Sequence, residues 1–345
     1  MTELGESMMA VRIARIGKPR VLRYERCPMP IPTPDEALVK IHATSANPSD
    51  LLFRDGRFII RKPLPHILGN DLAGEIAQVG EDVSGWEPGD RVAACFEGLG
   101  RERDGSYAEY CTVPADQLVR MPDSLDFQVA VAAGASFANA WTALVGNGKI
   151  KKADRVVIKG AASPLGIAAV QIASAKGSQV IAISGSESAA QLREIGANIV
   201  LDDAGSDLVR QVKVATGELG ATLVLHSSDA DGLAQSIDML DYKGRLVLAS
   251  PAQSRDSQIN LIDVFLKNLS ILGSYDSLSI KDFESILLDF AKDKYQPAID
   301  EALPLSKARK AHEKMEKNPG FGKIVLAPDS VLEAAKKPDS WIPID

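Results

Sequence analysis

A run of small residues between two apolar segments is the first feature of this sequence that could do chemistry. It follows VVIK and leads into an amphipathic stretch, so it would join a buried strand to a helix. Such a junction directs backbone N–H groups and the positive end of a helix at one point, where dinucleotide-binding folds hold a pyrophosphate. The residues predicted to face the phosphates are Ala162, Ser163, Pro164, Leu165 and Gly166. Proline stands where glycine is usual and cannot donate an N–H.

The end of the next predicted strand discriminates between the two nicotinamide dinucleotides. An acidic residue at that position, about 20 residues after the turn, chelates the ribose of NAD and repels the 2′-phosphate of NADP. This sequence has SGSES there, and its acidic residue is Glu187. The small residues Ser184, Gly185, Ser186 and Ser188 are expected around the adenosine phosphate. They favour NADP(H) as the cofactor, whereas the glutamate argues in the opposite direction.

Both turns lie in a region that alternates short apolar runs with helical patterns. From about residue 126 the runs RVVIK, QVIAIS, NIVLD, TLVLHS, RLVLAS and LSILGSY are separated by helix-like segments. Continuously apolar strands between helices are typical of a doubly wound parallel sheet, so the predicted fold class is α/β. The turn therefore follows the first strand of a βαβ array, which favours a nucleotide site over a purely structural turn.

The remaining segments indicate a second domain. Before residue 126, short runs such as EALVKIHAT, GEIAQVG and YAEYCTV are separated by turn residues, which predicts a β-rich domain. After a helical segment near 280–292, a further helix pattern and the short strand FGKIVL fit a return of the chain to that first domain.

Composition excludes several classes of protein. The 345 residues carry 39 Lys and Arg against 46 Asp and Glu, a net charge of -7 without a basic run, so we expect no nucleic-acid partner. The most apolar stretch, 129–146, is too short and too polar to span a bilayer, so no membrane partner is expected. Cys27, Cys95 and Cys111 form no CxxC pair, which argues against a disulfide framework. The first ten residues hold no signal segment, so a cytoplasmic protein is expected.

Several phrases together resemble the medium-chain dehydrogenase/reductase superfamily over nearly the entire chain. They are ANPSD at 46–50, ILGNDLAGEIAQVGEDVSGWEPGDRV at 67–92, GSYAEY at 105–110, the GAASPLG turn, and FGKIVL at 321–326. The resemblance implies a GroES-like β-rich catalytic domain from residues 1–125 and 295–345, and a Rossmann NADP-binding domain from 126–294. It also implies an active site in the cleft between them, and a homodimer that pairs through the strand near 269–275.

The zinc alcohol dehydrogenases of this superfamily bind a catalytic metal through a Cys, a His and a further thiolate. The resemblance aligns these ligands with Asn47, Asn70 and a position near Ser136, where the required ligand types are missing. The four-cysteine structural zinc loop is also missing around residues 97–104. No metal is therefore expected. The sequence is similar to the zinc-free branch, which contains quinone oxidoreductases and 2-enoyl-thioester reductases.

Similarity to that branch implies further cofactor contacts. Asn139 and Thr142 would face the cofactor, and Ser227 would lie beneath its adenosine side. Lys323 would close the site from the C-terminal segment. Besides these, the resemblance places the following residues at the nicotinamide end or against the cofactor: Asn47, Ala249, Ser250, Pro251, Ser274 and Tyr275.

A reductase without metal can act by holding the nicotinamide against an electron-poor acceptor, since orientation lowers the barrier substantially. Negative charge that develops on the acceptor oxygen needs a donor, and Asn47 is the leading catalytic candidate, with a turn role before Pro48 as the alternative. The tyrosines that related subfamilies use are replaced by Leu52 and Phe58. Tyr275 is the remaining phenol that could donate a proton, and core packing is its alternative role.

Three interpretations of function stay open. The first is a zinc-free NADPH-dependent oxidoreductase that transfers hydride to quinones or other activated enone or carbonyl acceptors. The second is a trans-2-enoyl-CoA/ACP reductase, for which the basic residues Arg54, Arg57, Arg61 and Lys62 could bind a phosphopantetheine at the cleft mouth. The third is an NADPH-binding sensor with little turnover. In all three, a small-molecule site is expected.

The acidic residues near the predicted site have a simpler expected role. Asp50, Asp71 and Glu75 are predicted to be solvated turn carboxylates, or to pair with Arg54 or Arg91.

Overall fold

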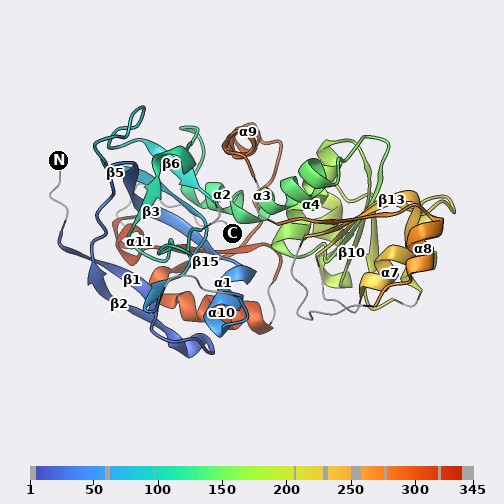
Figure 1. Ribbon diagram of the computed structural model, residues 1–345, viewed down its shortest axis with the longest axis horizontal. Coiled ribbons are helices and arrows are strands. Elements are labelled where there is room, and N and C mark those ends of the chain that lie inside the picture. Colours follow the sequence, from blue (N-terminus) through green and yellow to red (C-terminus); the bar gives the residue numbers. More distant parts are fainter. Residues whose placement is uncertain are drawn as a thin grey trace.

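The computed structural model describes residues 5–58, 63–96, 98–205, 207–227, 232–249, 258–275, 278–317 and 320–335. Two parts of the chain lie side by side along its longest axis, one rich in strands and one in which helices flank a sheet (Figure 1). Helices α2, Phe127–Ala132, and α3, Ala135–Trp141, run between them. These two helices therefore connect the parts at the place where a cleft is expected.

The second part contains a six-stranded, fully parallel sheet. Its strands lie in the order β11-β10-β9-β12-β13-β14, so the chain moves outward from β9 on one side and then returns to build the other. Ligands bind at such a change of direction, outside the carboxyl ends of the strands. The strands are β9 (Arg155–Lys159), β10 (Gln179–Ser184), β11 (Ile199–Asp202), β12 (Ala221–His226), β13 (Leu240–Leu248) and β14 (Ser270–Gly273).

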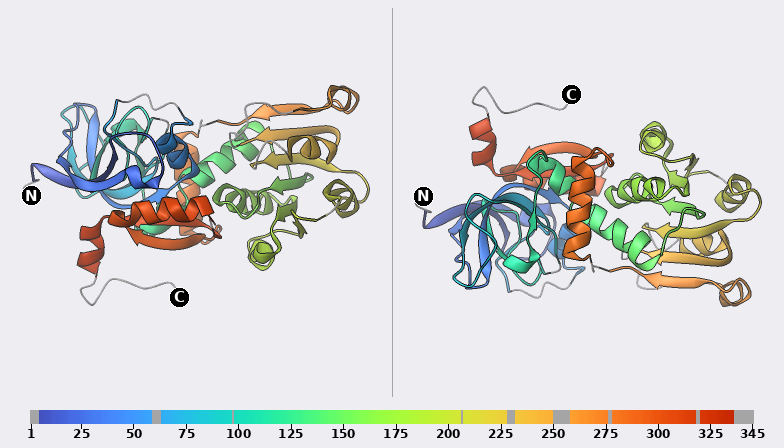
Figure 2. Two further views of the ribbon diagram at one scale, coloured as in Figure 1. Left: turned by 90° about the horizontal axis from the view of Figure 1, so that it is seen from below. Right: turned by 90° about the horizontal axis from the view of Figure 1, so that it is seen from above.

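Helices cover both faces of this sheet (Figure 2). They are α4 (Pro164–Ala175), α5 (Ala189–Glu194), α6 (Leu208–Ala215) and α7 (Leu233–Asp238), whereas α8 (Leu261–Leu266) lies beside β14 at one outer edge of the sheet. Helix α4 is apolar nearly all round because α3 packs on its outer side while the sheet covers its inner side. The predicted α/β class with a Rossmann sheet is confirmed. Helix α8, by contrast, is a short apolar element that the sequence patterns did not predict.

The first part is built around a seven-stranded sheet in the order β15-β16-β3-β5-β6-β8, with β7 paired to β3. A three-stranded sheet, β2-β1-β4, lies beside it. Strand β16 is antiparallel to β3, with Ile324 opposite Ala46, so the C-terminal segment joins the same sheet as the N-terminal segment. The strands are β1 (Ser7–Ile13), β2 (Leu22–Pro28), β3 (Glu36–Ala46), β4 (His66–Ile67), β5 (Leu72–Val79), β6 (Arg91–Ala94), β7 (Tyr110–Pro114), β8 (Val119–Arg120), β15 (Ile299–Pro304) and β16 (Lys323–Ala327).

Three further helices come from the C-terminal third of the chain. They are α9 (Ile280–Ala291), α10 (Ala308–Lys317) and α11 (Asp329–Ala335). Helix α10 lies beside α1, Pro48–Asp55, in the β-rich part (Figure 1). Within the described residues, no helix combines the length and the apolar character that a membrane crossing requires.

The segment NPSD begins helix α1, and Asn47 lies directly before Pro48 at the helix start. Asn47 is the N-cap residue, with extended backbone angles, and its backbone N–H donates to the Asp50 carboxylate at 2.8 Å. Proline at the first helical position is favourable because that position needs no N–H donor. Gly56 ends the helix with a positive φ of 81°, which glycine adopts without strain.

The apolar stretch 129–146 does not form one continuous helix. Gly134 separates α2 from α3, and the segment Thr142–Asn147 continues α3 as a π-helical turn. A Cβ atom at position 134 would lie 3.0 Å from the Cβ of Asp71, so the break allows the chain to pass closely over that carboxylate. The backbone N–H of Ala135, directly after the break, points to Asp71 Oδ2 at 3.4 Å.

The acidic residues expected in solvent are in fact mostly buried, which corrects that prediction. Asp50 and Asp71 are each 1% exposed, while Glu75 contacts His42 at 3.4 Å. Arg54 is also fully buried and binds neither Asp50 nor Asp71: it donates to the Gly17 carbonyl, to His312 and to Glu316. A surface-patch role for Arg54 is therefore excluded.

A directed chain of hydrogen bonds joins α10 to α1. An arginine can only donate, so His312 Nδ1 accepts from Arg54 at 3.1 Å and the ring proton is on Nε2. The Nε2–H therefore donates to the Tyr107 hydroxyl at 3.1 Å, and that hydroxyl donates to Asp50 Oδ2 at 3.1 Å. Burial, reinforced by the Arg54 charge, lowers the pKa of His312 to about 3.

Tyr107 and Asp50 have pKa shifts in the opposite direction. Burial raises the pKa of Tyr107 well above its usual value, and the nearby Asp50 carboxylate adds to that effect. Burial also raises the pKa of Asp50 to about 7, although the N–H groups of Asn47 and Gly69 and the Tyr107 hydroxyl lower it in part. The Tyr107 hydroxyl therefore keeps its proton near neutral pH, whereas the carboxyl group of Asp50 has a pKa within the neutral range.

The depressed pKa of His312 predicts a pH-dependent stability contribution. On acidification the unfolded chain gains a proton at His312 below its usual pKa of 6.5, whereas the folded chain does not until about pH 3. Relative to His312→Gln, whose amide can accept and donate but does not titrate, the wild type should lose about 2 kcal/mol of unfolding free energy between about pH 7.5 and pH 5. Urea unfolding of both proteins at the two pH values measures this difference. If the difference in unfolding free energy between the two proteins were the same at both pH values, the imidazole of His312 would not be held neutral.

Candidate active site

A cavity lies between the two parts of the chain, and residues from both line it. The β-rich part contributes α1 and the loops around positions 70 and 95–101, and the Rossmann part contributes the carboxyl ends of β9, β12, β13 and β14. The lining residues are Asn47, Pro48, Ser49, Leu52, Phe53, Phe58, Asn70, Cys95, Phe96, Arg101, Ala135, Ser136, Asn139, Ser163, Pro164, Leu165, Ser227, Ala249, Ser274 and Tyr275. The cavity thus coincides with the ligand crevice of a doubly wound sheet.

Many of the residues predicted from the sequence meet in this cavity. Nine line it: Asn47, Asn139, Ser163, Pro164, Leu165, Ser227, Ala249, Ser274 and Tyr275. Others are not among the lining residues, namely Thr142, Ala162, Gly166, Ser184, Gly185, Ser186, Ser188 and Lys323. Ser250 and Pro251 lie outside the described residues. The cofactor roles of all these residues stay predictions.

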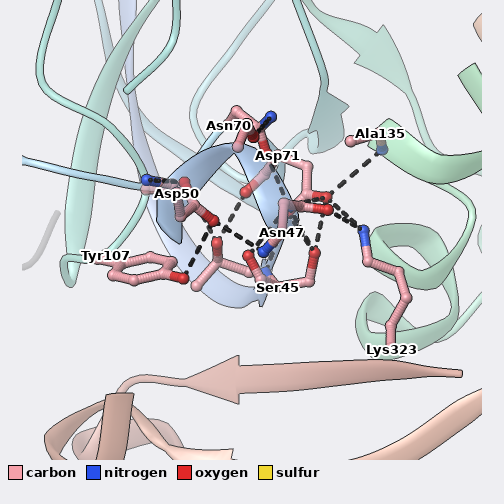
Figure 3. Close-up of polar contacts among 12 residues, drawn as sticks. Ser45, Asn47, Asp50, Asn70, Asp71, Tyr107, Ala135 and Lys323 are labelled. Carbon is pink, nitrogen blue, oxygen red and sulfur yellow. Dashed lines mark hydrogen bonds and ion pairs between the residues drawn. The ribbon is translucent and has the colours of Figure 1, made fainter. Parts of the chain in front are cut away.

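The polar centre of the site is a buried ion pair (Figure 3). Lys323 Nζ, at the start of β16, lies 2.8 Å from Asp71 Oδ2 and 2.9 Å from Asn47 Oδ1. Only 2% of Lys323 is exposed. Asp71 also accepts from the backbone N–H and the hydroxyl of Ser45, at 2.9 and 2.8 Å. The lysine therefore lies behind the cavity wall as a buried, compensated cation.

The ion pair connects to the cavity through two amide side chains. Asn47 Nδ2 donates to Asn70 Oδ1 at 2.7 Å, and Asn70 Nδ2 donates to the hydroxyl of Ser49 at 3.0 Å. Asn47 is 3% exposed, and both ends of its amide are bonded within the protein. Asn70 is only half-buried. The polar groups at this side of the cavity are therefore amides and hydroxyls with fixed partners.

These residues do not fit a catalytic zinc ion. Zinc sites need thiolate, imidazole or carboxylate ligands, and Asn47, Asn70 and Ser136 offer none. The nearby Asp71 carboxylate is engaged by the Lys323 ammonium, whose positive charge would repel a second cation. Among the described residues, no cluster of three His, Cys, Asp or Glu side chains could hold a metal.

The turn after β9 fits the pyrophosphate of a dinucleotide. Gly160 has a φ of 78°, and a Cβ atom at Gly166 would collide with the backbone of Gly160 and Ala161, so both positions require glycine. Ser163 caps α4, its hydroxyl accepting from the Gly166 N–H at 3.1 Å. The strand, the tight turn and the helix start therefore have the geometry that brings a phosphate to a helix N-terminus.

The predicted adenosine end lies at the carboxyl end of β10. Ser184 is buried, and its hydroxyl donates to the Gly185 carbonyl at 3.1 Å. The Glu187 side chain folds back over Gly185, where an added Cβ atom would collide with the carboxylate. A negative charge therefore lies within this small-residue turn, a feature that weakens the argument for NADP(H) from the serines alone.

The opposite wall of the cavity was only partly foreseen, since the family resemblance pointed to Leu52 and Phe58 but to neither Phe53 nor Phe96. Leu52, Phe53, Phe58 and Phe96 give it an apolar and largely aromatic surface. Arg101 Nη1 donates to the Tyr275 hydroxyl, and its guanidinium lies 5.6 Å from the ring centre of Phe53. The proton-donor role of Tyr275, which is 58% exposed, stays a prediction. The helix pattern of α1 could have revealed Phe53, whereas the loop residues carried no periodic signal.

Two family models match the chain: the alcohol dehydrogenase GroES-like domain over residues 33–123 and the zinc-binding dehydrogenase over residues 164–293. The quinone oxidoreductase of Rattus norvegicus is 30% identical over 327 residues, which cover 92% of this chain and 97% of that protein. Quinone oxidoreductase structures from Coxiella burnetii and Pseudomonas syringae each have a TM-score of 0.83 at 26% identity and cover 93% of this chain, with 99% and 100% of their own length covered. The chain therefore belongs to the medium-chain dehydrogenase/reductase superfamily, in its quinone oxidoreductase branch.

Proposed function

We propose that this protein is a zinc-free NADPH-dependent oxidoreductase that transfers hydride to quinones or other activated enone or carbonyl acceptors. One observation carries the proposal: a single cavity joins the start of α4, suited to a pyrophosphate, to a wall of aromatic side chains and a pair of oriented amides. Membership of the superfamily implies a nicotinamide cofactor, which supplies the hydride when bound.

The chemistry of the lining residues supports an electron-poor acceptor. Among the described residues that line the cavity, the ionisable side chains are those of Cys95, Arg101 and Tyr275, without a carboxylate or an imidazole. An unactivated ketone would need a Lewis acid or a strong proton relay. A quinone or enone accepts hydride without either, and its flat conjugated system matches the apolar wall of Leu52, Phe53 and Phe58.

The enoyl-thioester alternative has less support at the cleft mouth. Of the four basic residues proposed for a phosphopantetheine patch, Arg54 is buried and Arg57 is bonded to Asp55 at 2.6 Å. Arg61 and Lys62 lie outside the described residues. The quinone and enone class is therefore the better-supported acceptor.

We also propose a homodimer that pairs through the outer edge of the Rossmann sheet. Strand β14 is the last strand of that sheet, and it lies with α8 at one outer edge (Figure 2). Helix α8 exposes a continuous apolar surface, with Leu261 71%, Ile262 66%, Phe265 79% and Leu266 64% exposed. An apolar surface beside an unpaired strand edge is the usual signature of self-association. The cytoplasmic location stays a prediction.

Stopped-flow measurement of NADPH absorbance tests the proposed reaction. We expect oxidation by a benzoquinone, a naphthoquinone and an alkenal, because each accepts hydride without metal assistance. Crotonyl-CoA run in parallel tests the thioester alternative, and faster turnover of that substrate would contradict the proposal. Tight NADPH binding without oxidation by any acceptor would instead support a sensor.

The Glu187 carboxylate predicts how cofactor preference can be changed. Replacing it by Gln removes a negative charge beside the predicted 2′-phosphate site, so KM for NADPH should fall about fivefold, as expected for ~1 kcal/mol of screened repulsion. KM for NADH should stay the same or rise. Glu194→Gln removes an exposed charge from the end of α5 and serves as the matched control. Equal effects on both cofactors would place the 2′-phosphate elsewhere.

Charge introduced on α8 should separate the proposed dimer. Phe265→Glu places a carboxylate in the apolar surface, and sedimentation velocity should then show a monomer where the wild type is a dimer. Ile31→Glu changes an equally apolar residue, 85% exposed in the other domain, and should remain dimeric. A monomeric wild type, or a dimeric Phe265→Glu variant, would disprove pairing through this surface.

A further inference from the structure

We propose that Asn70 is the catalytic hydrogen-bond donor to the acceptor oxygen, and that Lys323 fixes its orientation through Asn47. The inference rests on the proposed function and deepens it, because it names the group that stabilises the reduced acceptor. Position 70 was singled out in the sequence only as a missing zinc ligand. In the structure, Asn70 is a half-buried residue that lines the cavity.

The first step is set by the chemistry of an ammonium group, which has three donors and no acceptor. Lys323 Nζ can therefore contact only the carbonyl oxygen of the Asn47 amide, which it meets at 2.9 Å. The ion pair with Asp71, itself 1% exposed, keeps the ammonium in this position. The amide of Asn47 consequently cannot flip without bringing its NH2 group against a cation.

The second step transmits this orientation to Asn70. With its oxygen toward Lys323, Asn47 must direct Nδ2 away, and that group donates to Asn70 Oδ1 at 2.7 Å. Asn70 therefore presents its own Nδ2 on the other side, where one N–H donates to the Ser49 hydroxyl at 3.0 Å. Within the described part of the chain this is the one acceptor that the group meets, which leaves its second N–H for a molecule in the cavity.

Asn70 fits the donor role better than Asn47, the residue favoured by the sequence. Asn47 Nδ2 lies within 3.2 Å of Ser45 and Asp71 oxygens in addition to Asn70, and the residue is 3% exposed. Its donors are therefore consumed inside the protein. The positioning role belongs to Asn47 and Lys323, and contact with the acceptor belongs to Asn70.

The reaction balances without a further co-reactant. The acceptor gains a C–H bond from the hydride, and its π-electron pair moves to its oxygen, while the reduced dinucleotide is oxidised by two electrons. Asn70 keeps its own protons and donates a hydrogen bond to the oxygen as the negative charge forms. Solvent water then supplies the proton. A flipped Asn70 would present its carbonyl oxygen and repel the same charge. The orientation of the Asn70 amide therefore decides whether it stabilises or destabilises the negative charge on the acceptor oxygen.

Two variants of Asn70 test the donor role. Asn70→Ala removes the donor, and Asn70→Asp preserves the size of the side chain and the acceptor for Asn47 while replacing the donor with an oxygen. Both should lower kcat/KM for a naphthoquinone by roughly 10²- to 10³-fold, the usual loss for one oxyanion donor, with KM for NADPH unchanged. Asn198→Asp makes the same chemical change at the start of β11, at the opposite edge of the sheet, and should be as active as the wild type.

The pH dependence of Asn70→Asp separates a donor from a structural role. When the new carboxyl group is protonated it regains an O–H donor, so activity relative to wild type should recover as the pH falls through its pKa. A purely structural defect would show no such recovery. Wild-type rates in Asn70→Asp and Asn70→Ala at neutral pH would overturn the proposal.

Binding of 4-nitrophenol provides a readout that does not need turnover. Its phenolate oxygen represents the reduced acceptor, and a donated hydrogen bond should make the bound phenol ionise about one pH unit lower in wild type than in Asn70→Ala. If no acceptor oxidises NADPH, the proposed function fails, yet this titration still tests Asn70. Equal ionisation of the bound phenol in both proteins would exclude the donor role.

The positioning role is tested at Asn47, since loss of Lys323 leaves Asp71 buried and unpaired and could prevent folding. Asn47→Ala leaves the ion pair but releases Asn70 to flip. We expect kcat to fall while KM for NADPH is retained, and the ionisation shift of bound 4-nitrophenol to shrink. Lys323→Arg preserves the cation and should retain more of that shift than Asn47→Ala. An unchanged shift in Asn47→Ala would show that Asn70 is oriented without the relay.

Discussion

The buried contact between Lys323 and Asp71 is the interaction on which the site depends. Two charges removed from water are stable together only when their remaining hydrogen bonds are satisfied, and here Asn47, Ser45 and the Ala135 N–H complete that set. The same contact joins the start of β16, the last strand in the sequence, to the residue directly before β5. One ion pair therefore both orients the Asn47 amide at the cavity and links the C-terminal strand to the rest of the β-rich domain.

A second buried network supports the first from the opposite side of α1. The chain Arg54, His312, Tyr107 and Asp50 contains no group that is free to change its hydrogen-bond direction, because it begins at an obligate donor and ends at a carboxylate. Asp50 then accepts hydrogen bonds from the backbone N–H groups of Asn47 and Gly69. Asn47 carries one of the two amides at the cavity, and Gly69 directly precedes Asn70, which carries the other. The site is consequently rigid at its polar end and apolar at its aromatic end.

Much of the fold was predictable from the sequence, because alternating apolar strands and helices leave a strong periodic signal. The phosphate turn was equally accessible, since glycine and serine are required there for local reasons. Asn70, Arg101 and the aromatic wall were not, because they lie on loops whose positions depend on distant contacts. The burial of Asp50 and Asp71 also could not be predicted from the neighbouring sequence, because their partners, Tyr107 and Lys323, are distant in the chain.

The order in which the chain is synthesised gives the Lys323 contact another significance. Asp71 and the amide pair are made early, but their cation arrives only after the whole Rossmann domain has been translated. Until then the β-rich domain lacks β15, β16 and the counter-charge for a carboxylate that it must bury. The Rossmann domain, which is continuous in sequence, can fold first as a unit. The Lys323 contact can therefore form only after the Rossmann domain has been synthesised, so a chain interrupted before β16 lacks the cation that compensates its buried Asp71 carboxylate.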